Sequence, residues 1–422
     1  MAMKSVLVAG ALGLAPALPA DAQTYAIQGG TVHTLSGESF VGTVVIRDGR
    51  IDAVGPEVSP PLGAEIVDAT GRHVYPGMFD AVTRLGLTEI GAVDVTNDAR
   101  EQGDFNPHLR AATAVHPASE HIPVARANGV TVTMSAPQGG DGSIAGQASL
   151  IGLDGWTVEE MAIEPGAALV VNFPSQAAGG NTTWSDAQTR YEEAVQRLDT
   201  WMEAGRQHAR ALESGGSVPR DLKLEAMADV AHGSLPVLLA ADGARNIRNA
   251  VEWAEAQGIR YVITGGREGW RIAEWLAERD VDMILSGAQA MPSGPDASYA
   301  EPYANAARLH AAGVRIAIST FDSSDSRLLP YEAAMSVPYG LPREAALAAV
   351  TRNAADMLGF GDRIGTLETG KLANVIVTDG DPLEIRTQIL DVFILGRRVS
   401  TDNRHEELYE RYRARPGRRL AS

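Results

Sequence analysis

Four charged side chains follow apolar segments of this 422-residue sequence and could do chemistry together. They are Asp80, Arg84, Asp242 and Asp322, after the candidate strands His73–Phe79, Pro236–Ala240 and Val314–Ser319. The ends of parallel strands meet on one face, so Asp242 and Asp322 could form a carboxylate pair for acid–base catalysis. Carboxylates at such a face also commonly bond loops, and this structural alternative stays open.

Arg84 is unusual on the inward face of a strand, because its guanidinium stays protonated in proteins. One interpretation is an anchor for a substrate carboxylate or phosphate. The alternative is a structural ion pair, and we predict that Arg84 bonds at least one of Asp80, Asp242 and Asp322. If that pair is buried, removing Arg84 should destabilise the fold by about 3–5 kcal/mol.

Three further polar residues are candidates for contact with a ligand. Asn172 ends the apolar segment Ala168–Phe173 and Thr320 follows the last candidate strand, so both are expected at the same face. His108 lies near two other histidines in the segment after the first strand. These histidines could hold a metal ion such as zinc, or they could be ordinary polar loop residues.

The middle of the chain alternates apolar segments with amphipathic helical patterns, which predicts parallel βα units. Seven candidate strands are His73–Phe79, Val130–Ser135, Ala168–Phe173, Pro236–Ala240, Tyr261–Gly265, Met283–Ser286 and Val314–Ser319. An eighth is expected within Asp221–Ala231 or Ala148–Leu153. The series predicts an α/β fold, a (β/α)8 TIM-like barrel, with its site at the carboxyl ends of the strands. A doubly wound open sheet is the alternative, although no glycine-rich phosphate loop follows any strand.

Both ends of the chain carry short β-branched segments separated by turn residues. We predict that residues 23–75 and 360–402 form one small composite β-sandwich and that residues 76–359 form the barrel. Residues 403–422 are expected to be a C-terminal tail.

Composition and the first residues limit the location and the partners of the protein. The net charge of −17 argues against nucleic-acid and anionic-membrane surfaces, and the absence of cysteine excludes disulfides and thiolate chemistry. Met1–Ala22 has a lysine, a short apolar stretch and a final Ala-Asp-Ala, the pattern of a secretory signal. We therefore expect an exported protein, periplasmic or extracellular, that leaves the membrane after cleavage; a retained anchor is the alternative.

Three motifs resemble the amidohydrolase superfamily, with its imidazolonepropionase-like subgroup as the closest. The motifs are IRDGRIDAVG at 46–55, YPGMFD at 75–80 and GDRIGTLETGKLAN at 361–374. The resemblance implies a distorted (β/α)8 barrel beside a composite β-sandwich. It also implies hydrolysis of C–N bonds in cyclic amides, imines or small peptides with one or two divalent metals.

The positions that would hold those metals depart from the family pattern. The resemblance places a His-x-His pair at Val82 and Arg84, single histidines at Ala240 and Gly265, and an aspartate at Phe321. Residues two apart on a strand share a face, which is why the family pair can bind one ion. Valine has no lone pair and arginine would repel a cation. We expect no metal at these positions, and we expect Val82, Arg84, Ala240 and Gly265 to converge in one pocket.

Two hypotheses about function follow. The first is an exported hydrolase that acts on non-peptide C–N bonds of a small cyclic amide or related substrate, with an altered metal site. The second is a catalytically inactive barrel, a pseudoenzyme, that binds a ligand or another molecule. The expected partner is a small-molecule ligand; a zinc site elsewhere and a homo-oligomer are left open.

Overall fold

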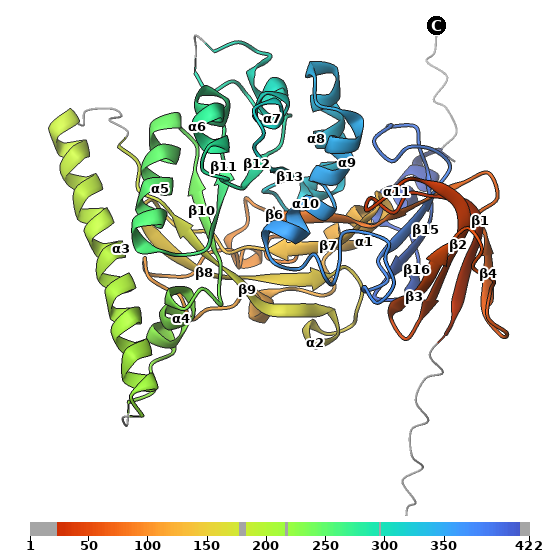
Figure 1. Ribbon diagram of the computed structural model, residues 1–422, viewed down its shortest axis with the longest axis horizontal. Helices are drawn as coiled ribbons and strands as arrows, with labels where there is room; N and C mark the ends of the chain where they lie inside the picture. Colours follow the sequence, from red (N-terminus) through yellow and green to blue (C-terminus); the bar gives the residue numbers. More distant parts are fainter. Residues whose placement is uncertain (1–22, 177–182, 216–217, 295–296, 414–422) are drawn as a thin grey trace, which may run out of the picture.

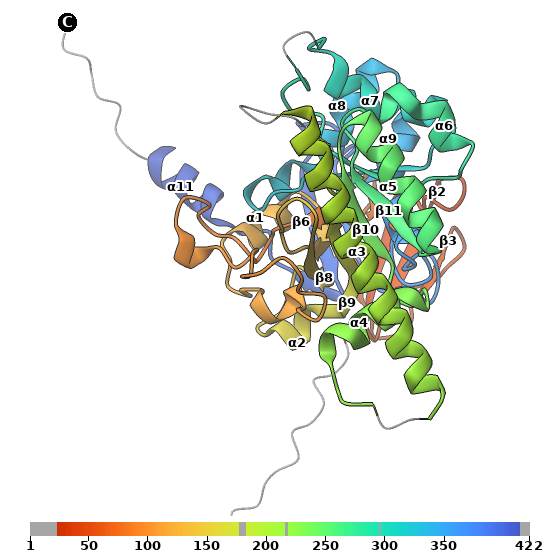
Figure 2. The same cartoon turned by 90° about the vertical axis from the view of Figure 1, so that its left-hand side faces the viewer.

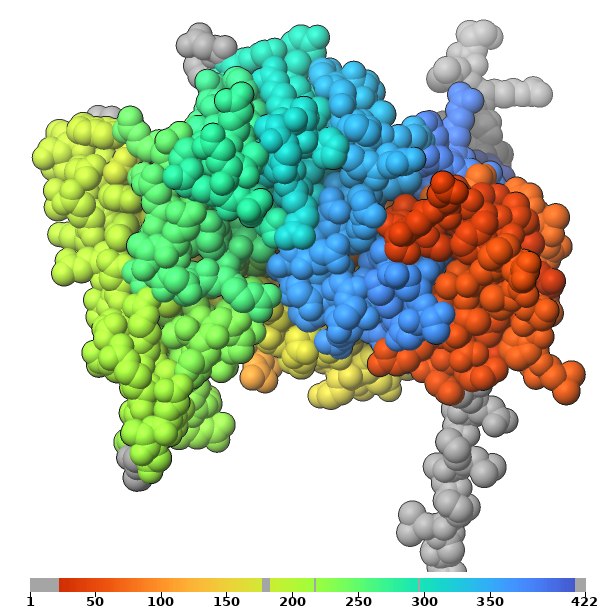
Figure 3. Space-filling model, in the orientation of Figure 1, coloured from red at the N-terminus to blue at the C-terminus, as the bar shows by residue number. Residues whose placement is uncertain are grey.

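The computed structural model describes residues 23–176, 183–215, 218–294 and 297–413. The expected signal segment Met1–Ala22 lies outside the described residues. In Figure 1 a barrel with its helices fills one side, and a sheet made from both ends of the chain fills the other. Figure 3 shows the two parts packed against each other on this face.

The barrel is a sheet of eight strands that nearly closes on itself. Its order is β13-β12-β11-β10-β9-β8-β7-β6. The strands are β6 (Met78–Thr83), β7 (Val130–Ser135), β8 (Ser143–Gly152), β9 (Ala162–Asn172), β10 (Val237–Ala241), β11 (Tyr261–Gly265), β12 (Met283–Ser286) and β13 (Ile316–Ser319). At the seam, the amide of Phe321 donates to the carbonyl of Val82 at 2.9 Å. The predicted α/β barrel is therefore confirmed.

The eighth strand departs from an ideal (β/α)8 arrangement. It is β8, which contains most of the expected segment Ala148–Leu153, whereas the other candidate segment forms helix α4 (Leu222–Ala231). Strand β8 runs antiparallel to both β7 and β9, while the other neighbouring pairs are parallel. The barrel is distorted because this hairpin strand stands where a helix-linked parallel strand would be expected.

Helices cover the outside of the barrel. They include α1 (His121–Ala127), α3 (Trp184–Glu213), α5 (Ala244–Gln257), α6 (Ala273–Ala277), α7 (Glu301–Ala311), α8 (Leu329–Ser336), α9 (Arg343–Ala349) and α10 (Arg352–Met357). The short helix α2 (Val158–Met161) follows β8, and α11 (Arg404–Arg413) ends the described chain. Figure 2 shows the long helix α3 running along the barrel with α4 and α5 beside it. None of the helices in the described segments is long and apolar enough to cross a membrane.

Both faces of the barrel strands are buried, which explains their continuous apolar sequences. Leu238, Val262 and Ile284 belong to the cluster inside the barrel. Their neighbours Leu239 and Ile263 belong to the cluster that includes buried side chains of the surrounding helices. This alternation decides which side chains can reach the barrel mouth.

The second sheet joins the two ends of the chain. It contains β1 (Tyr25–Val32), β2 (Phe40–Arg47), β3 (Arg50–Gly55), β4 (Glu65–Asp68), β5 (His73–Pro76), β14 (Val375–Thr378), β15 (Ile389–Ile394) and β16 (Arg397–Val399). Strands β5 and β14 pair antiparallel, which brings residues 73–76 beside residues 375–378. Ile27, Val44, Val377 and Phe393 pack in its buried core. The expected composite β-domain from both termini is confirmed.

Candidate functional site

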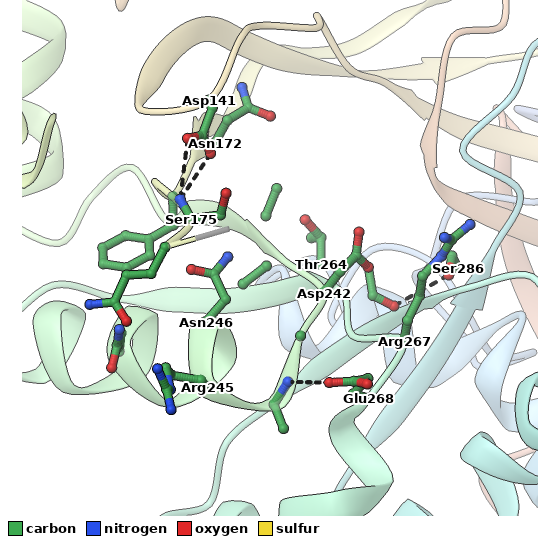
Figure 4. Close-up of a pocket in the computed structure, with 18 of the residues that line it drawn as sticks. Asp141, Asn172, Ser175, Asp242, Arg245, Asn246, Thr264, Arg267, Glu268 and Ser286 are labelled. Atoms are coloured by element: carbon green, nitrogen blue, oxygen red, sulfur yellow. Dashed lines mark hydrogen bonds between the residues drawn. The ribbon is translucent and has the colours of Figure 1, made fainter. Parts of the chain in front are cut away.

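A pocket of about 860 Å³ opens at the carboxyl ends of β9 to β12. Asn172, Ala240, Thr264 and Ser286 stand at the ends of these four strands, and Asp242 follows β10 (Figure 4). Its volume lies within the range of small-molecule sites, roughly 300–1,000 Å³. The sequence predicted Asn172 as a ligand contact and Asp242 as a candidate acid–base carboxylate, and both side chains line this pocket.

The four positions expected to converge do so only in part. Ala240 and Gly265 line the pocket, but Val82 and Arg84 do not. On β11 the inward side chain is that of Thr264, which is paired in register with Ala240. The expectation fails on β6 because that strand loses regular register with β7 between Asp80 and Thr83. Val82 instead packs against the apolar cluster inside the barrel.

Phe321 occupies the space beside the irregular seam. It adopts a left-handed backbone with φ of 57°, which is uncommon for a bulky residue, and its side chain lines the pocket. Asp322 follows it, three residues beyond the end of β13 and one residue after the position at which the family resemblance places an aspartate. The carboxylate of Asp322 does not line the pocket.

Arg84 forms an ion pair with Asp322, as the sequence predicted for one of three aspartates. Oδ1 of Asp322 also accepts the amide and the hydroxyl of Ser324, each at 2.9 Å. Burial alone would raise the pKa of Asp322, but these hydrogen bonds and the charge of Arg84 lower it below its usual value. Asp322 therefore caps a loop and pairs with Arg84, outside the pocket that Asp242 lines.

Replacing Arg84 by Met should destabilise the fold by about 1–2 kcal/mol, less than expected for a fully buried pair. The two side chains keep 26% and 32% of their surface exposed, and Ser324 still bonds the carboxylate when Arg84 is lost. Urea unfolding at neutral pH gives the value. Adding Asp322→Asn should cost little more, since the partner is already missing; additive losses would show that the two side chains do not interact.

Asp80 is fully buried and bonds the end of β13. Its carboxylate accepts the hydroxyl of Ser319, the amide of Thr320 at 3.0 Å and the hydroxyl of Thr320 at 2.5 Å. Burial raises the pKa of Asp80 to about 6, although these hydrogen bonds oppose the shift. Asp80 and Thr320, considered as substrate contacts, meet each other below the seam and do not line the pocket.

His108 also lies outside the pocket, and its Nδ1 is buried without a hydrogen-bond partner among the described residues. His121, from the same cluster, contacts the carbonyl of Glu89 through Nε2 at 2.9 Å. Within the described segments, no three histidine, aspartate or glutamate side chains are placed to hold a metal ion.

The residues at the family's metal-ligand positions do not fit a divalent cation. Arg84 is a cation itself, and Ala240 has no donor atom. Gly265 has a φ of 94°, and a Cβ there would lie 2.7 Å from Oδ1 of Asp242. Asp242 therefore occupies the space that a side chain at position 265 would need.

Sequence reasoning missed three large side chains of the pocket. Trp184 begins α3, Arg245 lies in the first turn of α5, and Arg267 follows β11 by two residues. The guanidinium of Arg245 lies 5.5 Å from the centroid of the Trp184 ring. The sequence positions of these residues, beyond the carboxyl ends of predicted strands, could have identified them, because the loops at that end of a barrel contact its ligand. Gly139, Gly140 and Asp141, in the loop between β7 and β8, also line the pocket.

Comparisons with known proteins agree with this fold. A profile described as the amidohydrolase family matches residues 271–402. Amidohydrolase tasK of Hapsidospora irregularis is 26% identical over 397 residues, covering 85% of this chain; the chain spans only 40% of tasK. Imidazolonepropionase of Acidiphilium cryptum is 26% identical over 370 residues, covering 81% of this chain and 88% of that protein. A solved amidohydrolase from Thermotoga maritima has a TM-score of 0.77 at 27% identity, covering 89% and 99% of the two chains.

Proposed function

We propose that this chain, which belongs to the imidazolonepropionase-like group of the amidohydrolase superfamily of hydrolases, binds a small molecule in the pocket at the barrel mouth. We also propose that the protein is exported and that it binds this molecule without a divalent metal at the family's metal-ligand positions. The observation that supports this proposal is that protein side chains fill the space around the family's metal-ligand positions. Arg84 is paired with Asp322, and Asp242 fills the space beside Gly265. Export rests on the signal pattern of Met1–Ala22.

A second candidate function is hydrolysis of a C–N bond in a small cyclic amide. Asp242 favours it, because its carboxylate is exposed in the pocket and has no hydrogen bond or ion pair within the described chain. A free carboxylate beside Thr264 could take a proton from an attacking water. Turnover of cyclic amides by the purified protein, lost in Asp242→Asn, would favour this candidate over binding alone.

Metal analysis tests the proposal. Protein purified without chelators should carry far less than one Zn, Fe or Mn per chain, and EDTA should leave its melting temperature unchanged, because no donor set holds an ion that stabilises the fold. Elemental analysis and thermal unfolding give the two readouts. One tightly held equivalent of metal, whose removal lowers the melting temperature, would contradict the proposal. Substitution of His108 would then show whether the loop histidines hold it.

A further inference from the structure

Two opposite charges in the pocket lack a partner. Asp242 and Arg267 both line it, both are exposed, and neither takes part in an ion pair within the described segments. They follow β10 and β11, which are parallel neighbours with Ala241 and Gly265 in register. Figure 4 shows Asp242 beside Thr264, with Arg267 farther along the same side of the pocket. Two neighbouring strand ends thus present one negative and one positive group that do not neutralise each other.

The other charged residues of the pocket contact the protein, although only Glu268 forms an ion pair within the described residues. Glu268 caps the first turn of α5 by accepting the amide of Ala244 at 3.0 Å, and it pairs with Arg271 at 3.4 Å. Asp141 accepts the amide of Ser175 at 3.0 Å. Arg245 stacks over a tryptophan ring, as described above. Asp242 and Arg267 differ from them in that their side chains have no hydrogen bond, ion pair or ring contact within the described residues, so they are the charged groups most open to a ligand.

Neutral groups complete the lining. Oδ1 of Asn246 is buried and has no hydrogen-bond partner among the described residues, so it can accept a donor from a ligand. Phe173, Trp184 and Phe321 provide apolar surface in the same pocket. Such a combination suits a molecule with an apolar body, at least one N–H group and charged ends.

We propose that the pocket binds a zwitterion, a free amino acid or a short peptide whose ammonium group meets Asp242 and whose carboxylate meets Arg267. A guanidinium can bond a carboxylate through two parallel N–H groups, and an aspartate accepts the hydrogens of an ammonium. A ligand with a single charge would leave either Asp242 or Arg267 without a partner, and its affinity would be lower for that reason. The inference rests on the proposed function, since it names the ligand class of the same pocket.

A library of unmodified dipeptides, with matched N-acetylated and C-amidated libraries, tests the ligand class by native mass spectrometry and calorimetry. The full chain should retain unmodified members, and either cap should weaken binding by about tenfold or more. Arg267→Gln should remove the penalty for the amide cap, and Asp242→Asn should remove the penalty for the acetyl cap. Arg386→Gln and Asp402→Asn change exposed residues that form no ion pair within the described chain, so both controls should bind like the original protein.

The outcomes separate this inference from the proposed function. Equal binding of capped and uncapped peptides would overturn the zwitterion and leave small-molecule binding intact. Failure of the folded protein to retain any member of the three libraries would also overturn it. A structural metal found by elemental analysis would overturn the proposed metal-free binding, while the cap penalties would still report which charges the ligand carries.

Discussion

Replacing Asp80 by Asn should stabilise the protein at pH 7 and leave its stability near pH 4 almost unchanged. Asp80 is fully buried, and its pKa is about 6 in the folded chain against an ordinary value of 3.8. Below the ordinary value the carboxyl is neutral in both the folded and the unfolded state. As the pH rises to about 6 the unfolded state ionises first, so the folded state loses about 3 kcal/mol of relative stability. An amide at this position never ionises and avoids that loss.

The hydrogen bonds around Asp80 make Asn a suitable replacement. An amide oxygen can still accept the amide of Thr320, and the hydroxyl of Thr320 can rotate to accept from the new NH2 group. Urea unfolding of both proteins between about pH 4 and pH 7.5 measures the difference. Asp322→Asn is the control of opposite sign, because the pKa of Asp322 is lowered and its ionised form stabilises the fold. A uniform loss of stability in Asp80→Asn at every pH would show that hydrogen bonding outweighs ionisation.

The barrel could be predicted because its signals are local. Helix α5 has buried residues at Ile247, Ala250, Val251 and Ala254, and it ends at Gly258 in the left-handed conformation that favours glycine. This spacing is one of the amphipathic patterns that predict βα units, and the helix spans Ala244–Gln257. Strand β8 was harder to predict because it is fully buried on both faces and rich in small residues. The strand begins at Ser143, directly after a glycine-rich loop, and nothing in the local sequence determines its antiparallel direction.

The site could be predicted only where a residue's chemistry was itself informative. An arginine at the end of an apolar strand requires a negative partner, so the pair of Arg84 with Asp322 could be predicted. The irregular register of β6 and the left-handed backbone of Phe321 have no local signal in the sequence, so the absence of Val82 from the pocket and the presence of Phe321 in it could not be predicted. Arg267 has no distinguishing feature in the sequence, and only the fold places it in the same pocket as Asp242.

Replacing Gly77 by Ala should destabilise the protein by about 3 kcal/mol or more, the upper range for overpacking a core. Gly77 lies between β5 and β6, where the chain passes from the composite sheet into the barrel. A Cβ at this position would lie 2.1 Å from Oγ1, 2.3 Å from Cγ2 and 2.7 Å from Cβ of Thr131. Thr131 is fully buried on β7, and its β-branched side chain has little rotational freedom. The two strands must therefore separate to admit one methyl group.

Gly91→Ala is the matched control, since a Cβ there would have no atom within 4 Å and the backbone is not left-handed. Its effect on the free energy of unfolding should stay within about 0.5 kcal/mol. Adding Thr131→Ala to Gly77→Ala removes the two nearest atoms and should recover part of the lost stability, so the double variant should be more stable than the sum of the single changes predicts. If Gly77→Ala lowered the free energy of unfolding no more than the control does, close contact with β7 could not explain why the YPGMFD motif has glycine after proline. Recovery by Thr131→Ala would instead tie that motif to the close approach of β6 and β7 at the entrance to the barrel.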